Sequence, residues 1–152
     1  MKNFDRNYIN IALEFSKMSS CVSHQVGCII VKDGRILSTG YNGTPAGYKF
    51  NCDQVFPNYN PATDREKHRE FSAFTELHSE INGLIYAARK GISIEGASVY
   101  CTTEPCKDCM KALIGAGIRK IIFLNQYDGN DSIRDKMIEF YRDCGIDFGR
   151  LS

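Results

Sequence analysis

Apolar residues recur along the first third of the chain in a helical pattern and then in a strand pattern. Between residues 4 and 18 they recur at steps of three and four: Tyr8, Ile11, Ala12, Phe15 and Met18. This spacing predicts an amphipathic helix that packs against a sheet. Two short apolar runs, 28–31 and 35–39, follow on either side of Asp33-Gly34, a two-residue sequence typical of hairpin turns. We therefore expect two antiparallel strands after the helix.

A long segment without a sustained period runs from Gly40 to Pro61. Its first part is rich in Gly and Pro and its second part in Asn and Asp, which predicts a loop. Loops longer than about 15 residues in compact domains are usually functional or disordered. This segment is therefore a candidate binding loop.

The rest of the chain alternates between helical and strand patterns. A second helical face ends near Gly91, and its apolar positions are Leu77, Ile81, Leu84, Ile85 and Ala88. Beyond it, the patterns predict strands at 97–101, 120–124 and 146–148 and helices at 106–116 and 132–143. This alternation predicts an α/β fold with a mixed or largely parallel sheet that helices cover on both faces.

Size and charge narrow the class of protein. The chain has 152 residues, 43% of them hydrophobic and 24% charged, which fits a single domain over residues 1–152. The net charge of +1 gives no strong field to attract nucleic acid or anionic lipid. No apolar run reaches the roughly 18 residues that a membrane span requires. We expect a cytoplasmic protein without a membrane or nucleic-acid partner.

Seven cysteines are an odd number, so they cannot all pair into disulfides within one chain. In a reducing compartment, a Cys-x-x-Cys spacing such as that of Cys106 and Cys109 more often holds zinc or performs redox chemistry. Three further cysteines, Cys28, Cys101 and Cys144, are most simply small apolar residues of the core.

One group of residues has the composition of a catalytic zinc site. His78-Ser79-Glu80 precedes Pro105-Cys106-Lys107-Asp108-Cys109 by 24 residues. One imidazole (His78) and two thiolates (Cys106 and Cys109) leave the fourth position of a tetrahedral zinc open for water. Zinc lowers the pKa of such a water to about 7, and Glu80, which is not a ligand, can accept its proton and pass it to a substrate. The pattern H-x-E followed by P-C-x-x-C is the signature of the zinc nucleobase deaminases.

At these residues the sequence resembles the zinc-dependent cytidine deaminase superfamily. Over nearly its whole length it is similar to the deoxycytidylate (dCMP) deaminases, particularly those of bacteriophages, and three further segments carry the similarity: 25–31 (QVGCIIV), 40–47 (GYNGTPAG) and 80–89 (EINGLIYAAR). The resemblance implies a three-layer αβα fold with a five-stranded mixed sheet flanked by helices. It also implies hydrolysis of dCMP to dUMP and ammonia in pyrimidine deoxynucleotide metabolism, in the host cytoplasm if a phage encodes the protein.

The same resemblance implies regulation and assembly. Members of the family are commonly activated by dCTP and inhibited by dTTP, with Mg²⁺ accompanying the triphosphate, and typically form hexamers. The counterpart of the effector segment is Gly40, Tyr41, Asn42, Gly43, Thr44 and Gly47. Backbone N–H groups in a glycine-rich segment suit phosphate oxygens, although the same residues also fit a simple turn.

Substrate residues and a second metal also follow from the resemblance. The substrate-binding positions are Asn42, Ser79 and Arg89, and a second, non-catalytic zinc would be held by Cys21, Cys52, His68 and Glu76. Judged alone, Arg89 and His68 would be solvated residues, with His68 in the charged run 64–70. Cys52 alone would be an incidental loop thiol.

Two departures from the family pattern leave alternatives open. Ser79 stands where alanine is usual, and Glu104 precedes Pro105, as in tRNA adenosine deaminases. The first alternative is therefore a tRNA or other nucleobase deaminase, which should show clustered basic residues. The second is a non-enzymatic, zinc-stabilised binding module, which should show four protein ligands and no positioned carboxylate. Tyr86 and Tyr127 could stack on a base, but packing is the simpler role for both.

Overall fold

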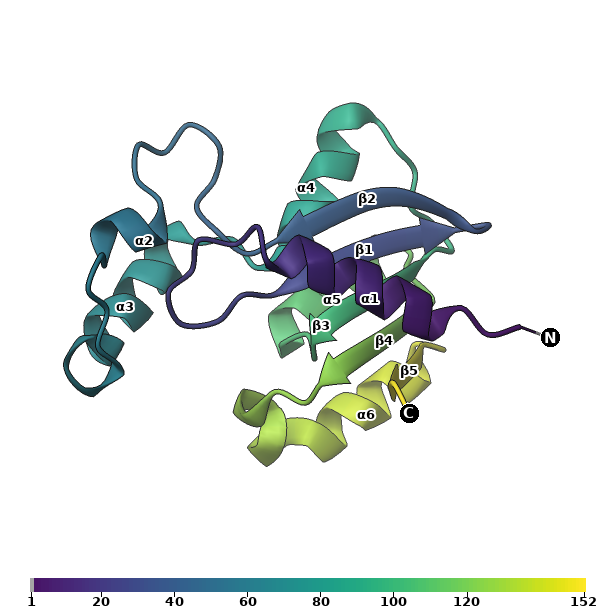
Figure 1. Cartoon of the computed structure of the whole chain (residues 1–152). Helices are drawn as coiled ribbons and strands as arrows, with labels where there is room; N and C mark the ends of the chain where they lie inside the picture. Colours follow the sequence, from purple (N-terminus) through teal and green to yellow (C-terminus); the bar gives the residue numbers. More distant parts are fainter. Residues whose placement is uncertain (1) are drawn as a thin grey trace.

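A computed structural model describes residues 2–152, which form a five-stranded sheet between two layers of helices (Figure 1). The strands are β1 (Gly27–Lys32), β2 (Arg35–Tyr41), β3 (Ser98–Thr103), β4 (Lys120–Asn125) and β5 (Asp147–Arg150), in the order β2-β1-β3-β4-β5. β2, β1 and β3 are antiparallel neighbours, whereas β3, β4 and β5 run parallel. The mixed α/β sheet that we expected is confirmed.

Helices cover both faces of the sheet because residues along the strands alternate between its two sides. α1 (Asp5–Ser16) packs on one face, where Ile9 and Ala12 meet Ile29 and Tyr100. The opposite face carries α4 (Ser79–Lys90), α5 (Lys107–Gly115) and α6 (Arg134–Asp143), and its core contains Cys28, Ile30, Val99, Cys101, Met110 and Leu113. The core positions of Cys28 and Cys101 are confirmed, and Cys144 is partly buried at the edge of this core.

The Asp-Gly hairpin is also confirmed. Asp33 and Gly34 both have positive φ, 51° and 74°, as the two central residues of a type I′ turn require. Lys32 and Arg35 pair on either side of the turn. The turn therefore sets the register in which β1 meets β2.

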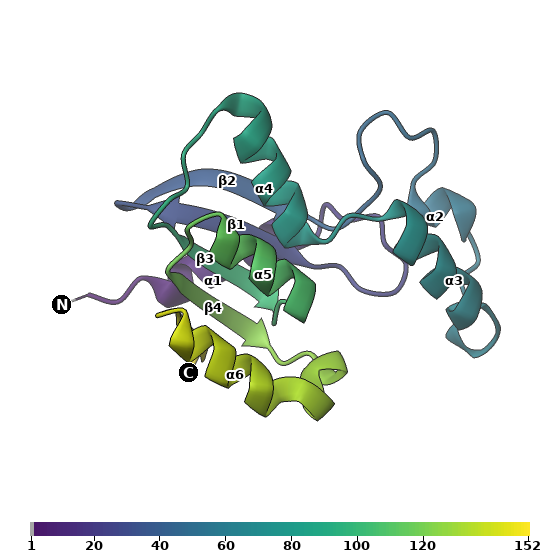
Figure 2. The same cartoon turned by 180° about the vertical axis from the view of Figure 1, so that it is seen from behind.

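The segment from Gly40 to Pro61 is more ordered than its composition predicts. It contains the short helix α2 (Cys52–Val55), and a longer helix, α3 (Pro61–Thr75), begins at its end. In Figures 1 and 2, α2 and α3 lie side by side at one end of the molecule, away from the sheet. The apolar pattern did not reveal α3 because its only buried residue is His68, but Asn60-Pro61 is a helix-start signal: the Asn60 side chain caps the N–H of Ala62 at 2.9 Å.

Smaller differences concern the ends of elements. The helix expected at 132–143 is preceded by a 3-10 turn, η1 (Asp128–Ile133), and α1 ends before Met18, which is 60% exposed. Within residues 2–152, every helix is too short or too polar to cross a membrane.

Candidate active site and metal clusters

Two helix N-termini bring the predicted catalytic ligands together. His78 is the N-cap of α4, Cys106 is the N-cap of α5, and Cys109 lies in the first turn of α5. α4 and α5 lie next to each other on the same face of the sheet (Figure 2). The His78 Nδ1 atom is 3.2 Å from the Cys109 sulfur and 3.7 Å from the Cys106 sulfur.

These distances fit a tetrahedral zinc site. With Zn–S bonds of about 2.3 Å and Zn–N bonds of about 2.0–2.1 Å, ligand nitrogen and sulfur atoms around one zinc lie about 3.6 Å apart. The three ligating atoms all lie within 4.8 Å of one another. Among the described residues, this group offers three protein ligands, and His78 is exposed to solvent. Three protein ligands beside an exposed edge are the donor set that would suit a catalytic zinc.

The electrostatics of the cluster favour a bound cation. The hydrogen bond from Cys109, together with that from His78, lowers the pKa of the Cys106 thiol to about 4. The hydrogen bond to Cys106, followed by burial, raises the pKa of Cys109. Hydrogen bonding to Cys106 likewise raises the pKa of His78. The positive ends of two helix dipoles point at the same atoms and also favour thiolate.

Glu80 is the carboxylate beside this cluster. It lies in the first turn of α4 and is 3% exposed, and its burial raises the pKa of its carboxyl group. The hydroxyl of Ser79, which is fully buried, donates a hydrogen bond to Glu80 Oε2 at 3.2 Å. A carboxylate with a raised pKa accepts a proton more readily at neutral pH, which suits a general base.

The predicted effector segment lies directly against the start of α4. Gly40 approaches so closely that a Cβ atom there would fall 2.0 Å from the backbone oxygen of Ser79. Gly43 forms an isolated antiparallel bridge with Leu77, next to His78. Beyond these residues, Thr44 Oγ1 donates to the Phe50 oxygen at 3.2 Å, and Gly47 turns the chain with φ of 96°. Packing against the start of α4 therefore requires a glycine at position 40, whatever else the segment binds, whereas a Cβ atom at position 43 would meet open space.

The predicted substrate residues are not all gathered at the zinc cluster. The side chain of Asn42 accepts from the Val26 N–H at 2.9 Å and donates to the His24 oxygen at 2.8 Å, so it braces the loop before β1. Arg89 is exposed in the last turn of α4. It lies eleven residues after His78, which corresponds to about 16 Å along a helix.

A second cluster joins three segments that are distant in the sequence. Cys21, Cys52 of α2, His68 of α3 and Glu76 present ligand atoms that all lie within 4.8 Å of one another. The His68 Nε2 atom is 3.5 Å from the Cys21 sulfur and 3.6 Å from Glu76 Oε1. His68 is 7% exposed and Cys52 is fully buried. His68 is therefore not the solvated residue that its charged neighbours alone would suggest, and Cys52 lies in a helix and not in a loop.

This second cluster also fits a cation. The carboxylate of Glu76 is 2% exposed, and neither of its oxygens has a hydrogen-bond partner among the described residues. Burial raises the pKa of Cys21, and raises that of Cys52 to about 12. A buried carboxylate that accepts no hydrogen bond is costly, and a metal cation would both neutralise it and favour the thiolates.

The structure adds residues that the sequence did not single out. Arg134, at the start of α6, forms an ion pair with Glu104, and Asn130 donates to the Pro105 oxygen at 3.1 Å. Asn130 and Arg134 come 25 and 30 residues after Pro105 and Glu104, the residues that they contact. The sequence hinted at this contact only through Glu104, an acidic residue at a position where the family usually has an apolar or small one.

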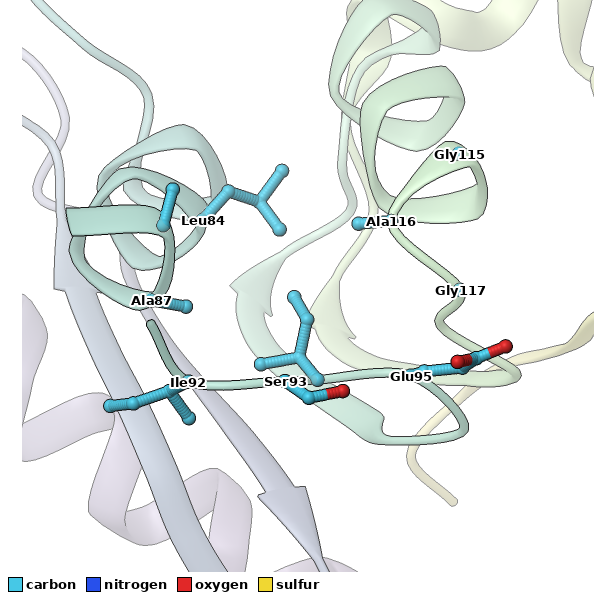
Figure 3. A pocket seen from close by; sticks show the side chains of 10 residues that line it. Leu84, Ala87, Ile92, Ser93, Glu95, Gly115, Ala116 and Gly117 are labelled. Atoms are coloured by element: carbon cyan, nitrogen blue, oxygen red, sulfur yellow. The ribbon is translucent and has the colours of Figure 1, made fainter. Parts of the chain in front are cut away.

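A cavity of about 590 Å³ lies away from both clusters, between the C-terminal ends of α4 and α5 (Figure 3). Leu84 and Ala87 of α4 face Ala116, which follows α5, across it. None of the metal-ligating residues lines this cavity.

Comparison with known proteins agrees with the geometry. The profile of the "Cytidine and deoxycytidylate deaminase zinc-binding region" family matches residues 2–125. The deoxycytidylate deaminase of Enterobacteria phage T4 is 37% identical, with 91% of this chain and 85% of the relative covered, and that of phage T2 is 36% identical, with 95% and 94% covered. The crystal structure of dCMP deaminase from the cyanophage S-TIM5 in complex with dCMP and dUMP is 33% identical, with a TM-score of 0.77 over 99% of both chains. The chain therefore belongs to the zinc-binding cytidine and deoxycytidylate deaminase family and has its fold.

Proposed function

We propose that this protein is a dCMP deaminase, which hydrolyses the 4-amino group of dCMP and releases dUMP and ammonia. One observation carries the proposal: His78, Cys106 and Cys109 converge at two helix N-termini, beside the buried carboxylate of Glu80. The phage deoxycytidylate deaminases, which are similar over almost the whole chain, support the choice of substrate.

The residues around the cluster have distinct roles in this reaction. His78, Cys106 and Cys109 would hold a zinc ion, which when bound would supply a Lewis acid that lowers the pKa of water to about 7. Glu80 would accept one proton of that water and deliver it to the ring nitrogen N3 while the water oxygen forms a bond to C4 of cytosine. Glu80 would then pass the second proton of the water, from the new C4 hydroxyl, to the 4-amino group, and the C4–N bond would break as ammonia leaves. The exposed edge at His78 leaves a path for the substrate.

Deamination of dCMP, deoxycytidine, dCTP and a tRNA anticodon stem-loop by the purified protein tests the proposal. We expect selective turnover of dCMP, measured as loss of cytosine absorbance. Glu80→Gln should retain zinc and lose turnover by about 100- to 10,000-fold, because it removes only the proton acceptor. Activity on the stem-loop alone would instead place the protein among the tRNA deaminases. A zinc-loaded protein that deaminates none of these would be a binding module.

The second cluster is proposed to hold a structural zinc. Cys21, Cys52, His68 and Glu76 are four ligands, which is the number that a closed structural site uses. A metal there would join α2 and α3 to the segment before β1 and would offset the entropy lost in ordering residues 42–60.

Zinc content per chain tests this second site. We expect two zinc ions in the wild-type protein and one in Cys21→Ala or His68→Ala, with the catalytic zinc retained. Cys144→Ala removes a half-buried thiol outside both clusters and should retain two. One zinc in the wild type, or an unchanged count in both ligand variants, would exclude the site.

Regulation and assembly are proposed on the family resemblance. dCTP with Mg²⁺ would activate the enzyme and dTTP would inhibit it through residues 40–47, in a homohexamer that works in the cytoplasm. The contacts of Gly40 and Gly43 with the start of α4 support this proposal, because a ligand on that segment would press on the helix that carries Glu80. The backbone of Arg89 lies about 16 Å along α4 from that of His78, so its guanidinium is proposed to contact the phosphate end of the nucleotide and not the base. Turnover of dCMP with and without the two triphosphates, together with the mass in solution, tests these points.

A further inference from the structure

Among the three ligands of the first cluster, Cys106 depends strongly on the chain that precedes it. Cys109 lies inside the first turn of α5, whereas Cys106 is the N-cap at which this helix begins, with φ of −70° and ψ of 167°. The helix holds Cys106 through its carbonyl, which accepts from the Met110 N–H at 2.9 Å. Because the N-cap lies half outside the helix, the residues before it set the direction from which its side chain enters the cluster.

The first of these residues, Glu104, is anchored by its backbone and by its side chain. Its N–H donates to the oxygen of Asn125, the last residue of β4, at 2.8 Å. Its carboxylate is 1% exposed, and both oxygens accept hydrogen bonds from Arg134 at the start of α6. Oε1 also accepts from the Tyr127 N–H, and the Arg134 guanidinium donates to the Tyr127 oxygen, each at 3.2 Å. Glu104 is therefore held to β4, to the loop after it and to α6.

The second residue, Pro105, is held by the same loop. Proline has no N–H, so its carbonyl is the one backbone group through which this residue can be hydrogen-bonded. That oxygen accepts from the Asn130 side chain at 3.1 Å, and Asn130 is 2% exposed. The Asn130 N–H in turn donates to the Tyr127 oxygen at 3.1 Å. The segment 127–134 therefore holds both residues that lead into Cys106.

Stability alone does not explain the buried ion pair in this arrangement. Burying a carboxylate against a guanidinium costs desolvation that their attraction often only balances, and apolar residues of similar size would fill the same space. A planar guanidinium with paired hydrogen bonds does, however, fix one geometry. Contacts of this kind around metal ligands orient them, and their loss typically lowers metal affinity about 10- to 100-fold.

We propose that Glu104, Asn130 and Arg134 are positioning residues for Cys106, which hold the Pro105-Cys106 turn in the geometry that receives the metal. The inference rests on the proposed function, through the zinc that His78, Cys106 and Cys109 would hold. It assigns the three positioning residues to zinc affinity and leaves proton transfer to Glu80.

The zinc affinity of this one cluster tests the proposal. The protein is equilibrated with chelator-buffered zinc and treated briefly with iodoacetamide, and peptide mass spectrometry gives the fraction of Cys106 that zinc protects from alkylation. Arg134→Lys retains the charge but loses the paired hydrogen bonds, so it should raise the free zinc concentration for half-protection about 10- to 100-fold. Arg134→Gln should raise it at least as much. Arg142→Gln, at an exposed position of α6, is the matched control and should leave it unchanged.

A purely structural role for the ion pair predicts a different result. It would lower the Tm of the zinc-free and the zinc-loaded protein equally, and it would leave the half-protection concentration of the folded variants at the wild-type value. The positioning role predicts that the rise in Tm on adding zinc becomes smaller, because that rise depends on affinity. Asn130→Ala removes the hydrogen bond to Pro105 without leaving a buried charge, and it should shift half-protection in the same direction even where the Arg134 variants fail to fold.

The possible failures can be told apart. An unchanged half-protection concentration in a folded Arg134 variant or in Asn130→Ala would overturn this inference and leave the proposed function intact. An equal loss of protection at Cys52, in the second cluster, would show that the change acts on the whole fold and would also overturn it. A wild-type protein whose Cys106 no zinc concentration protects, and which does not deaminate dCMP, would overturn both the function and the inference.

Discussion

Gly40→Ala tests whether the contact between β2 and α4 sets the geometry of the active site. The new Cβ atom would lie 2.0 Å from the Ser79 oxygen and 2.8 Å from the Gly83 nitrogen, whereas ordinary contact begins at 3.4 Å. Both neighbours are backbone atoms of α4, which cannot rotate away as a side chain would. The start of the helix must therefore move back by more than an ångström, and it carries Glu80 with it.

Two effects follow from that movement. Overpacking of this kind costs about 1–3 kcal/mol, which lowers the Tm of a domain of this size by about 2–4 °C for each kcal/mol. A displacement of about 1 Å in a catalytic group can reduce turnover about 100-fold. We therefore expect Gly40→Ala to lower the Tm by a few degrees and the kcat for dCMP by about 100-fold.

Two other glycines provide matched controls. A Cβ atom on Gly27 would fall 2.1 Å from the Ala12 oxygen, a similar overlap, but against α1 on the opposite face of the sheet. Gly27→Ala should lower the Tm to a similar extent and leave the kcat of the folded enzyme near wild type. A Cβ atom on Gly83 would lie 3.4 Å from Ile30 Cδ1, so Gly83→Ala should be tolerated and should gain about 0.5–1 kcal/mol of helix stability. Thermal unfolding, zinc content and kcat of the three variants give the test; equal losses of kcat in Gly40→Ala and Gly27→Ala would refute the reasoning.

Two further predictions concern side-chain hydrogen bonds. Ser79→Ala removes the bond to Glu80 and should lower kcat/KM less than tenfold, with the preference for dCMP over deoxycytidine unchanged; a changed preference would mean that Ser79 touches the substrate. At Asp5, burial opposes ionisation, but hydrogen bonds from Tyr100 and Lys120 outweigh it and lower the pKa of the carboxyl group. The stabilisation is therefore present above the unfolded pKa of about 3.9 and is lost as pH falls through the lower folded value. Asp5→Asn should destabilise the protein by about 1 kcal/mol at pH 7. Urea unfolding of both proteins should show that this difference becomes smaller below pH 4.

The sequence predicted those parts of the fold whose signals are local. The continuous apolar run of β1, the Asp33-Gly34 turn and the helical period of α4 each require only a few neighbouring residues. α3 has no apolar stripe because it packs around His68, with Phe56 and Tyr59 lying edge-on or tilted at 5.5 Å and 5.4 Å from its ring. A helix whose one buried residue is a histidine leaves no hydrophobic period in the sequence.

The same distinction applies to the site. His78, Glu80, Cys106 and Cys109 were readable because their spacing within each motif reflects one helix turn or less. The partnership between Glu104 and Arg134 spans 30 residues and depends on how α6 returns to the sheet, which no spacing in the sequence encodes.

Two different contacts set the positions of the residues in the candidate active site. The reacting groups sit on the first turns of α4 and α5, where their positions depend on how closely those helices approach the sheet. At Gly40 the absence of a side chain permits the close approach of α4, and Glu104, which precedes the Pro105-Cys106 turn, is held by an ion pair with the partly exposed Arg134. Movement at the first contact changes the position of Glu80 and should appear in kcat, whereas loss of the second frees the turn that carries Cys106 and should appear in the zinc content. If Gly40→Ala lowered chiefly the zinc content and Arg134→Gln chiefly the kcat of the zinc-loaded enzyme, this division between the two contacts would be wrong.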